Sequence, residues 1–185
     1  MTDNVIAHEV VQVEHHMLAL HDGRATAYPE LPPSNGLVGV TQGMLIVFTG
    51  IAHGPVSLTV HARHLPPPAL DQDAWDEIVD VSMTATADVC TDGATLPPLT
   101  IAGPGTYRVR VHARGRDTSP DATVTSPVEE YLIVAWPQPT GVDTVHQLTD
   151  SYGAQLRAST SIPGPTIRTD PEQQRRDDQL RRAGR

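Results

Sequence analysis

The sequence predicts an all-β protein, an antiparallel β-sandwich of about seven or eight strands with a short C-terminal helix and a polar tail. The first observation is the number of expected turns, because 17 Pro and 14 Gly are spread between short apolar runs along the 185 residues. The second is that several runs alternate apolar and polar side chains with the period of two that half-buried strands show. The third is size, since roughly 130 residues of such runs are enough for one core.

The expected strands follow one another along most of the chain. They cover residues 9–20, 37–48, 56–63, 78–87, 99–102, 106–114 and 130–136. Gly39 and Gly43 mark bulge or bend positions in the second of these runs. In the third run four apolar side chains alternate with polar ones and are expected to face the core: Val56, Leu58, Val60 and Ala62.

The strand over residues 106–114 has the clearest alternation. Its expected inward positions are Tyr107, Val109, Val111 and Ala113, and its outward positions are Arg108, Arg110, His112 and Arg114. Tyr107 follows a Gly-Pro-Gly turn, which resembles the tyrosine corner of Greek-key sandwiches, where the hydroxyl bonds a nearby backbone group. The alternative is a tyrosine that packs at a strand edge without that bond.

The chain divides into three parts. Residues 1–138 are expected to form the sandwich domain, and residues 139–158 a short helical extension. Within the extension, Val145 and Leu148 belong to an apolar pattern with helical spacing over residues 144–157. Residues 159–185 have almost no apolar content and are expected to form a disordered, charged tail.

Charge and composition exclude several classes of function. With 13 basic and 22 acidic residues the formal net charge is −9, which argues against general binding to nucleic acid phosphates. No apolar run approaches the roughly 20 residues of a membrane span, and residues 1–10 lack the features of a secretory signal. Cys90 is the single cysteine, which fits a reducing compartment. We therefore expect a cytoplasmic protein with no membrane and no nucleic acid partner.

An acidic stretch is the candidate partner-binding site. Between Arg63 and Arg108 the chain has seven acidic residues and no arginine, and five of these acids lie within ten residues around Trp75. An anionic patch with an aromatic anchor fits a basic protein partner. The alternative is a solvated loop that keeps the protein soluble. The residues expected to contact the partner are Asp71, Asp73, Trp75, Asp76, Glu77 and Asp80.

Neither a reaction nor a bound metal is predicted. The chain has nine histidines, but His15 and His16 fall on opposite faces of a strand, as do His61 and His64. No His-x-His pair, metalloprotease motif, phosphate-binding loop or serine nucleophile motif is present. We therefore expect no catalytic residues, no metal ligands and no cofactor.

The layout of the strands carries a family resemblance. It is formed in chain order by the segments VEHHMLALHDG, LVGVTQGMLIVFTG, PVSLTVHARH, VDVSMTATADVCTDGATL, LTIAGPGTYRVRVHARG and EEYLIVAWP. This order resembles the competence protein J family, inhibitors of a DNA-entry nuclease. The phrases TYRVRVHARGRD and EEYLIVAWP are also similar to those of uncharacterised bacterial proteins. The family implies a non-enzymatic, acidic β-sandwich that binds and blocks a nuclease.

These observations lead to one expected function and two alternatives. We expect a non-enzymatic protein-binding module, an inhibitor or immunity protein against a basic nuclease or toxin. The first alternative is a β-sandwich that binds a small ligand or a metal through its histidines. The second is a structural assembly component that docks through its C-terminal tail.

Overall fold

The described part of the chain folds into ten strands and one helix. The structure, a computed structural model, describes residues 4–68 and 72–160. The strands are β1 (Val5–Glu14), β2 (Met17–His21), β3 (Val38–Thr41), β4 (Met44–Phe48), β5 (His53–Ala62), β6 (Glu77–Ala85), β7 (Cys90–Thr91), β8 (Gly105–Arg114), β9 (Glu130–Pro137) and β10 (Thr144–Leu148). The helix α1 (Ser151–Thr160) follows β10.

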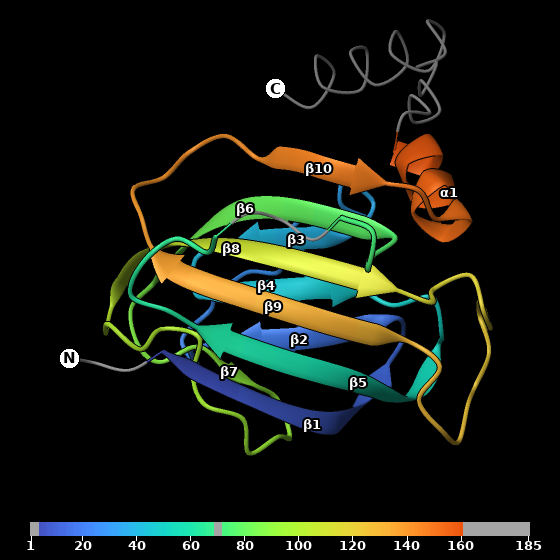
Figure 1. Cartoon of the computed structure of the whole chain (residues 1–185), viewed down its shortest axis with the longest axis horizontal. Helices are drawn as coiled ribbons and strands as arrows, with labels where there is room; N and C mark the ends of the chain where they lie inside the picture. The colour runs from blue at the N-terminus through green and yellow to red at the C-terminus, as the bar shows by residue number, and fades with distance from the viewer. Residues whose placement is uncertain (1–3, 69–71, 161–185) are drawn as a thin grey trace, which may run out of the picture.

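All ten strands belong to one mixed sheet. Its order is β10-β6-β8-β9-β5-β1-β2-β4-β3, with β7 paired to β2. The sheet curls, so that β2, β4 and β3 lie behind the other strands and β3 packs against β6 (Figure 1). The expected antiparallel sandwich is therefore wrong in two respects: the sheet is continuous, and β5 pairs with β9 in parallel. Alternating side chains indicate which face of a strand is buried, but not which strand lies beside it.

The predicted core faces are confirmed. On β8 the side chains of Tyr107, Val109, Val111 and Ala113 are buried, and on β5 so are those of Val56, Leu58, Val60 and Ala62. They pack inside the curl against rear-strand residues such as Leu20 and Leu45. Two of the outward arginine and histidine positions of β8, Arg108 and His112, are also buried, because further chain covers that face.

Two of the expected single strands are hairpins. The run 9–20 divides into β1 and β2 at a two-residue turn whose residues, His15 and His16, have φ of 52° and 62°. Histidine is enriched among the non-glycine residues found at positive φ. The run 37–48 divides into β3 and β4, which pair antiparallel about a turn where Gly43 has φ of 72°.

The region after residue 138 differs from expectation. Residues 144–148 form β10, which pairs with β6 at the edge of the sheet, and the helix begins only at Ser151. The spacing of Val145 and Leu148 fits one helix turn but does not require it, and Asp150 starts the helix by accepting the amide of Gly153 at 2.7 Å. The part of the expected tail beyond residue 160 lies outside the described residues. In the part of the chain that is described, no helix has the length and apolar character needed to cross a bilayer.

The tyrosine corner is present. The hydroxyl of Tyr107 donates to the carbonyl oxygen of Gly103 at 2.7 Å and accepts the amide of Ala102 at 3.2 Å. Residues 99–102 consequently form a turn rather than the expected strand. This turn fixes the start of β8 against the segment that precedes it.

Candidate functional site: the open edge of β1

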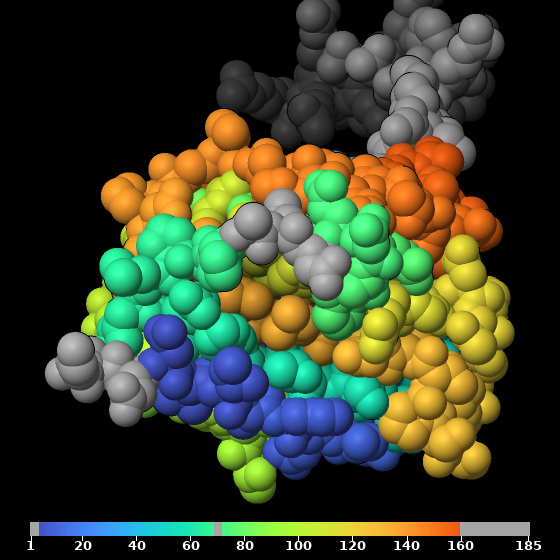
Figure 2. Space-filling view, in the orientation of Figure 1, coloured from blue at the N-terminus to red at the C-terminus, as the bar shows by residue number. Residues whose placement is uncertain are grey.

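Among the described strands, β1 is paired along its whole length on one side and by a single residue pair on the other. All ten of its residues pair with β5, from Val5↔Ala62 to Glu14↔His53. On the other side the single pair with β2 is Glu14↔Met17, immediately next to the turn. Figure 2 shows β1, in blue, along the rim of the front face of the molecule. This rim is the open edge of the sheet.

The register identifies the backbone groups that face outward. Ser57 of β5 and Arg63, the residue after β5, donate their amides toward β9, to the carbonyls of Glu129 at 3.0 Å and Ala135 at 2.8 Å. Odd-numbered residues of β5 therefore point to β9, and even-numbered residues point to β1. The even residues pair with odd residues of β1, as in Val56↔Val11. The N–H and C=O groups that face away from the sheet are consequently those of Ile6, His8, Val10 and Gln12.

No other segment within residues 4–68 and 72–160 occupies these groups. Across the described residues, none of the backbone hydrogen bonds of loops and turns reaches Ile6, His8, Val10 or Gln12. A strand advances about 3.3 Å per residue, so the open edge is roughly 20 Å long. Such an edge is a template for pairing with another strand.

The side chains on this edge favour contact with a further chain. Ile6 is 64% exposed and Val10 is 51% exposed on the outer face of β1. Natural edge strands are commonly protected from pairing by proline, lysine or a charge that points inward. β1 has no proline, and its one inward-pointing charge, Glu9, is engaged within the fold by hydrogen bonds from Thr95.

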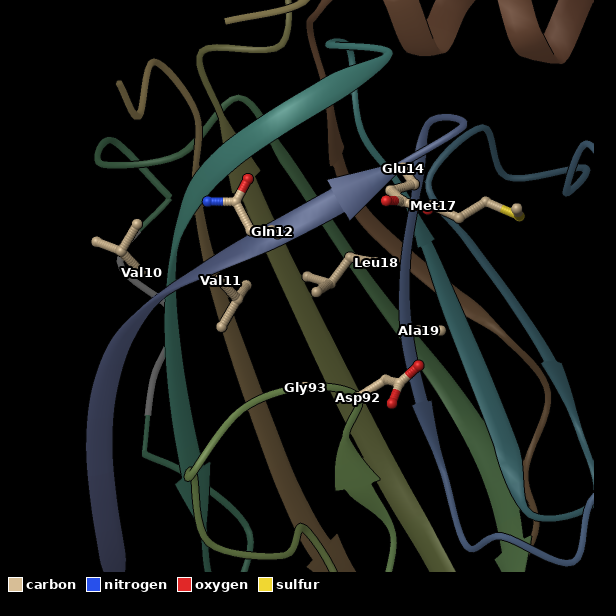
Figure 3. A pocket seen from close by; sticks show the side chains of 9 residues that line it. All are labelled: Val10, Val11, Gln12, Glu14, Met17, Leu18, Ala19, Asp92 and Gly93. Atoms are coloured by element: carbon tan, nitrogen blue, oxygen red, sulfur yellow. The ribbon is translucent and has the colours of Figure 1, made fainter. Parts of the chain in front are cut away.

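A cleft opens beside the same edge. β1 and β2 diverge from the turn, with Glu14 and Met17 at the apex and the turn of Asp92 and Gly93 across the wide end (Figure 3). Val11 and Leu18 point toward one another from the two strands and form the apolar floor. The cavity has a volume of about 410 Å³. It is large enough to take side chains from a strand laid against β1.

The apex of the cleft is fixed by contacts to α1. Tyr152 of the helix stacks on the ring of His16, and its hydroxyl lies 3.0 Å from His16 Nδ1. The amide of His16 donates to Ala52. The first turn of the helix is held in turn by Asp117, whose carboxylate accepts the amides of Ser151 and Tyr152 at 2.8 Å. These contacts hold the turn between β1 and β2 in place, and the two strands diverge from it.

A buried ionic cluster anchors this end of the molecule. Arg116 is fully buried and makes two hydrogen bonds to Asp150, at 2.6 and 2.9 Å. Its guanidinium also lies 3.4 Å from Glu77, which accepts from Arg157 at 3.1 Å. Burial, reinforced by the nearby charge of Asp150, raises the pKa of Glu77 to about 7. The cluster joins β6 and α1 to the loop after β8.

The structure corrects the predicted partner site at two of its six residues. Glu77 is 0% exposed in the cluster above, and Asp80 is 5% exposed and held by Arg110 at 2.6 and 3.0 Å. Burial alone would raise the pKa of Asp80, but hydrogen bonds from Arg110 and His146 lower it. Neither carboxylate is exposed to solvent. The sequence predicts surface charges at both positions because the arginines that neutralise them are distant in the sequence.

The other described residues of the predicted site differ in exposure. Asp73 is exposed, while Trp75 is half-buried with its ring 5.2 Å from the guanidinium of Arg114. Asp76 accepts the amide of Gly115 at 2.8 Å. Asp71 lies outside the described residues.

The residues that the sequence did not single out are those of the open edge. The predicted strand begins at residue 9, whereas β1 begins at Val5. Ile6 and His8 therefore lie outside the predicted strand. The alternation of Val11 and Val13 with polar residues indicates a half-buried strand but not that it lies at an edge. Within residues 4–68 and 72–160, no group of three or more His, Cys, Asp or Glu side chains could hold a metal ion.

Comparison with known proteins adds little. No protein family model matches the chain, and no curated protein matches it. A solved structure that is similar, titled "Crocagin biosynthetic gene J", shares 14% sequence identity over 74% of this chain and 99% of its own, with a TM-score of 0.44. Such a distant likeness transfers no activity. The comparisons give no support to the resemblance to the competence protein J family.

Proposed function

We propose that this protein is a non-enzymatic protein-binding module that takes up an extended segment of a partner along β1. The observation that carries the proposal is the one-sided pairing of β1, which leaves the backbone groups of Ile6, His8, Val10 and Gln12 facing outward. In strand addition, main-chain hydrogen bonds provide affinity and pockets for alternate side chains provide specificity. The open edge supplies the main-chain hydrogen-bonding groups, and the cleft beside it supplies a pocket for side chains.

The narrower form of the proposal is an inhibitor or immunity protein against a basic nuclease or toxin. It is supported by the formal charge of −9, which would speed encounter with a basic partner. The acidic stretch around Trp75 supports it less than the sequence suggests, because Glu77 and Asp80 are buried in internal ion pairs. The open edge of β1 replaces that stretch as the proposed contact.

A proline at position 8 tests the proposal. His8→Pro removes an outward N–H and places a ring against any incoming strand, but it leaves the hydrogen bonds to β5 intact. Wild-type protein and the variant are used as baits in a host extract, and the captured proteins are identified by mass spectrometry. Val142→Ser is the matched control, since Val142 is 86% exposed and lies outside β1.

The expected result is a partner captured by the wild type and by Val142→Ser but not by His8→Pro. Equal thermal unfolding of the three proteins shows that the loss is not a folding defect. Capture of the same partner by all three proteins would mean that binding does not use the edge of β1.

A further inference from the structure

An added strand would present alternate side chains to two different surroundings. Because successive residues of a strand point to opposite faces, one set would lie on the outer face beside Ile6 and Val10. The other set would point toward the buried floor of the cleft, formed by Val11 and Leu18. The outer set therefore meets the exposed side chains of β1, Ile6, Val10 and Glu14 among them, and the inner set meets the apolar floor.

The lining of the cleft carries negative charge. Of its nine residues two are acidic, Glu14 and Asp92, and none is basic. Both side chains are exposed, and in the described part of the chain neither belongs to an ion pair. Glu130, by contrast, pairs with Arg114 at 2.6 Å. The two carboxylates stand at opposite ends of the cleft, one at the apex and one at the wide end (Figure 3).

We infer that the partner segment is basic and places a lysine or arginine on its outer face within reach of Glu14 or Asp92, with apolar residues on the same face beside Ile6 and Val10 and on the opposite face over Val11 and Leu18. The inference rests on the proposed function and names the chemistry of its ligand. A long aliphatic stem can lie against the exposed Val10 at the rim of the cleft while its charged end reaches a carboxylate. An acidic segment would meet two like charges there, which is unfavourable.

The test uses a display library of random ten-residue peptides. The library is selected on the wild-type protein after depletion on His8→Pro, so that the recovered peptides depend on the edge of β1. Their composition is then compared with that of peptides selected on the double variant Glu14→Gln/Asp92→Asn. Asp73→Asn is the matched control, because it removes an exposed acidic charge away from the cleft.

The expected result is enrichment of Lys and Arg at alternate positions with the wild type and with Asp73→Asn, but not with the double variant. The peptides of highest affinity should bind the double variant about two- to thirty-fold more weakly, as expected for two partly exposed charge pairs. Their binding to the wild type should also weaken as salt rises to 1 M.

Other outcomes overturn one claim or both. Peptides that depend on the edge but are neutral or acidic would overturn the inference and leave the proposed function standing. Recovery of no edge-dependent peptide would overturn both. A dimer of the wild-type protein in sedimentation that His8→Pro converts to monomer would show a second copy on the edge, and would also overturn the inference.

Discussion

Replacing Arg116 by methionine removes a guanidinium group that holds four parts of the chain together. The side chain is fully buried, bonds Asp150 through two nitrogens, and donates to the carbonyls of Gly36 at 2.9 Å and Phe48 at 3.1 Å. Methionine fills a similar volume but donates no hydrogen bond and carries no charge. The variant therefore leaves the carboxylates of Glu77 and Asp150 buried without their main cation.

The expected cost follows from these contacts. Breaking a buried ion pair by removing one partner costs about 3–5 kcal/mol, because the remaining charge is left uncompensated. Arg114→Met is the matched control, two residues away. Arg114 is about half exposed, at 47% of its side chain, and pairs with Glu130 at 2.6 Å, so its loss should cost about 1 kcal/mol or less. A domain of this size is stable by about 5–15 kcal/mol, so the difference is measurable.

Urea denaturation, followed by circular dichroism, provides the free energies of unfolding. The deficit of Arg116→Met should shrink as pH falls from 7 to 5, because protonation of Glu77 removes one of the uncompensated charges. Equal destabilisation by the two variants, or a deficit of Arg116→Met that grows at low pH, would refute the assignment of Arg116 as the cation of the cluster.

Two further predictions concern single groups. Tyr107→Phe removes the hydroxyl bonds to Gly103 and Ala102 and should lower the free energy of unfolding by about 1–2 kcal/mol, as measured in urea; an unchanged value would mean that the corner is not stabilising. Because the folded-state pKa of Glu77 is raised to about 7 from 4.5, its contribution is fully present below pH 4.5 and is lost as pH rises through 7. The stability of wild type relative to Glu77→Gln should fall by about 3 kcal/mol between pH 4 and 8, and a constant difference would contradict the raised pKa.

The buried faces of the strands were predictable because they depend on local pattern. The alternation of Val109 and Val111 with Arg108 and Arg110 fixes the inward face wherever β8 lies in the sheet. The bond of Tyr107 was likewise predictable, since the turn that supplies its partner immediately precedes it. Local spacing is enough for both.

Neighbour relations were not predictable in the same way. The parallel pairing of β5 with β9 joins residues about seventy positions apart along the chain, as in Leu58↔Tyr131, and no local pattern encodes it. Whether Val145 belongs to a strand or a helix depends on the exposed edge of β6 being available to pair with it. Only the assembled sheet decides these points.

The same limit applies to the candidate site. Acidic residues such as Glu77 and Asp80 are usually exposed, so their sequence indicates a surface patch. They are buried because Arg116 and Arg110 reach them from other segments. The open edge of β1 is also a property of the whole sheet, because it exists only where β2 diverges after one pair.

The most direct test of the proposed edge is amide hydrogen exchange along β1, measured by NMR on the free protein and with a saturating library-selected peptide. In the free protein, the amides of Ile6, His8, Val10 and Gln12 should exchange rapidly, while those of the alternate residues, which bond to β5, should be protected. Peptide binding should protect the four outward amides and leave the others unchanged. Protection of the outward amides in the free monomer, or no change in them on binding, would contradict strand addition at β1.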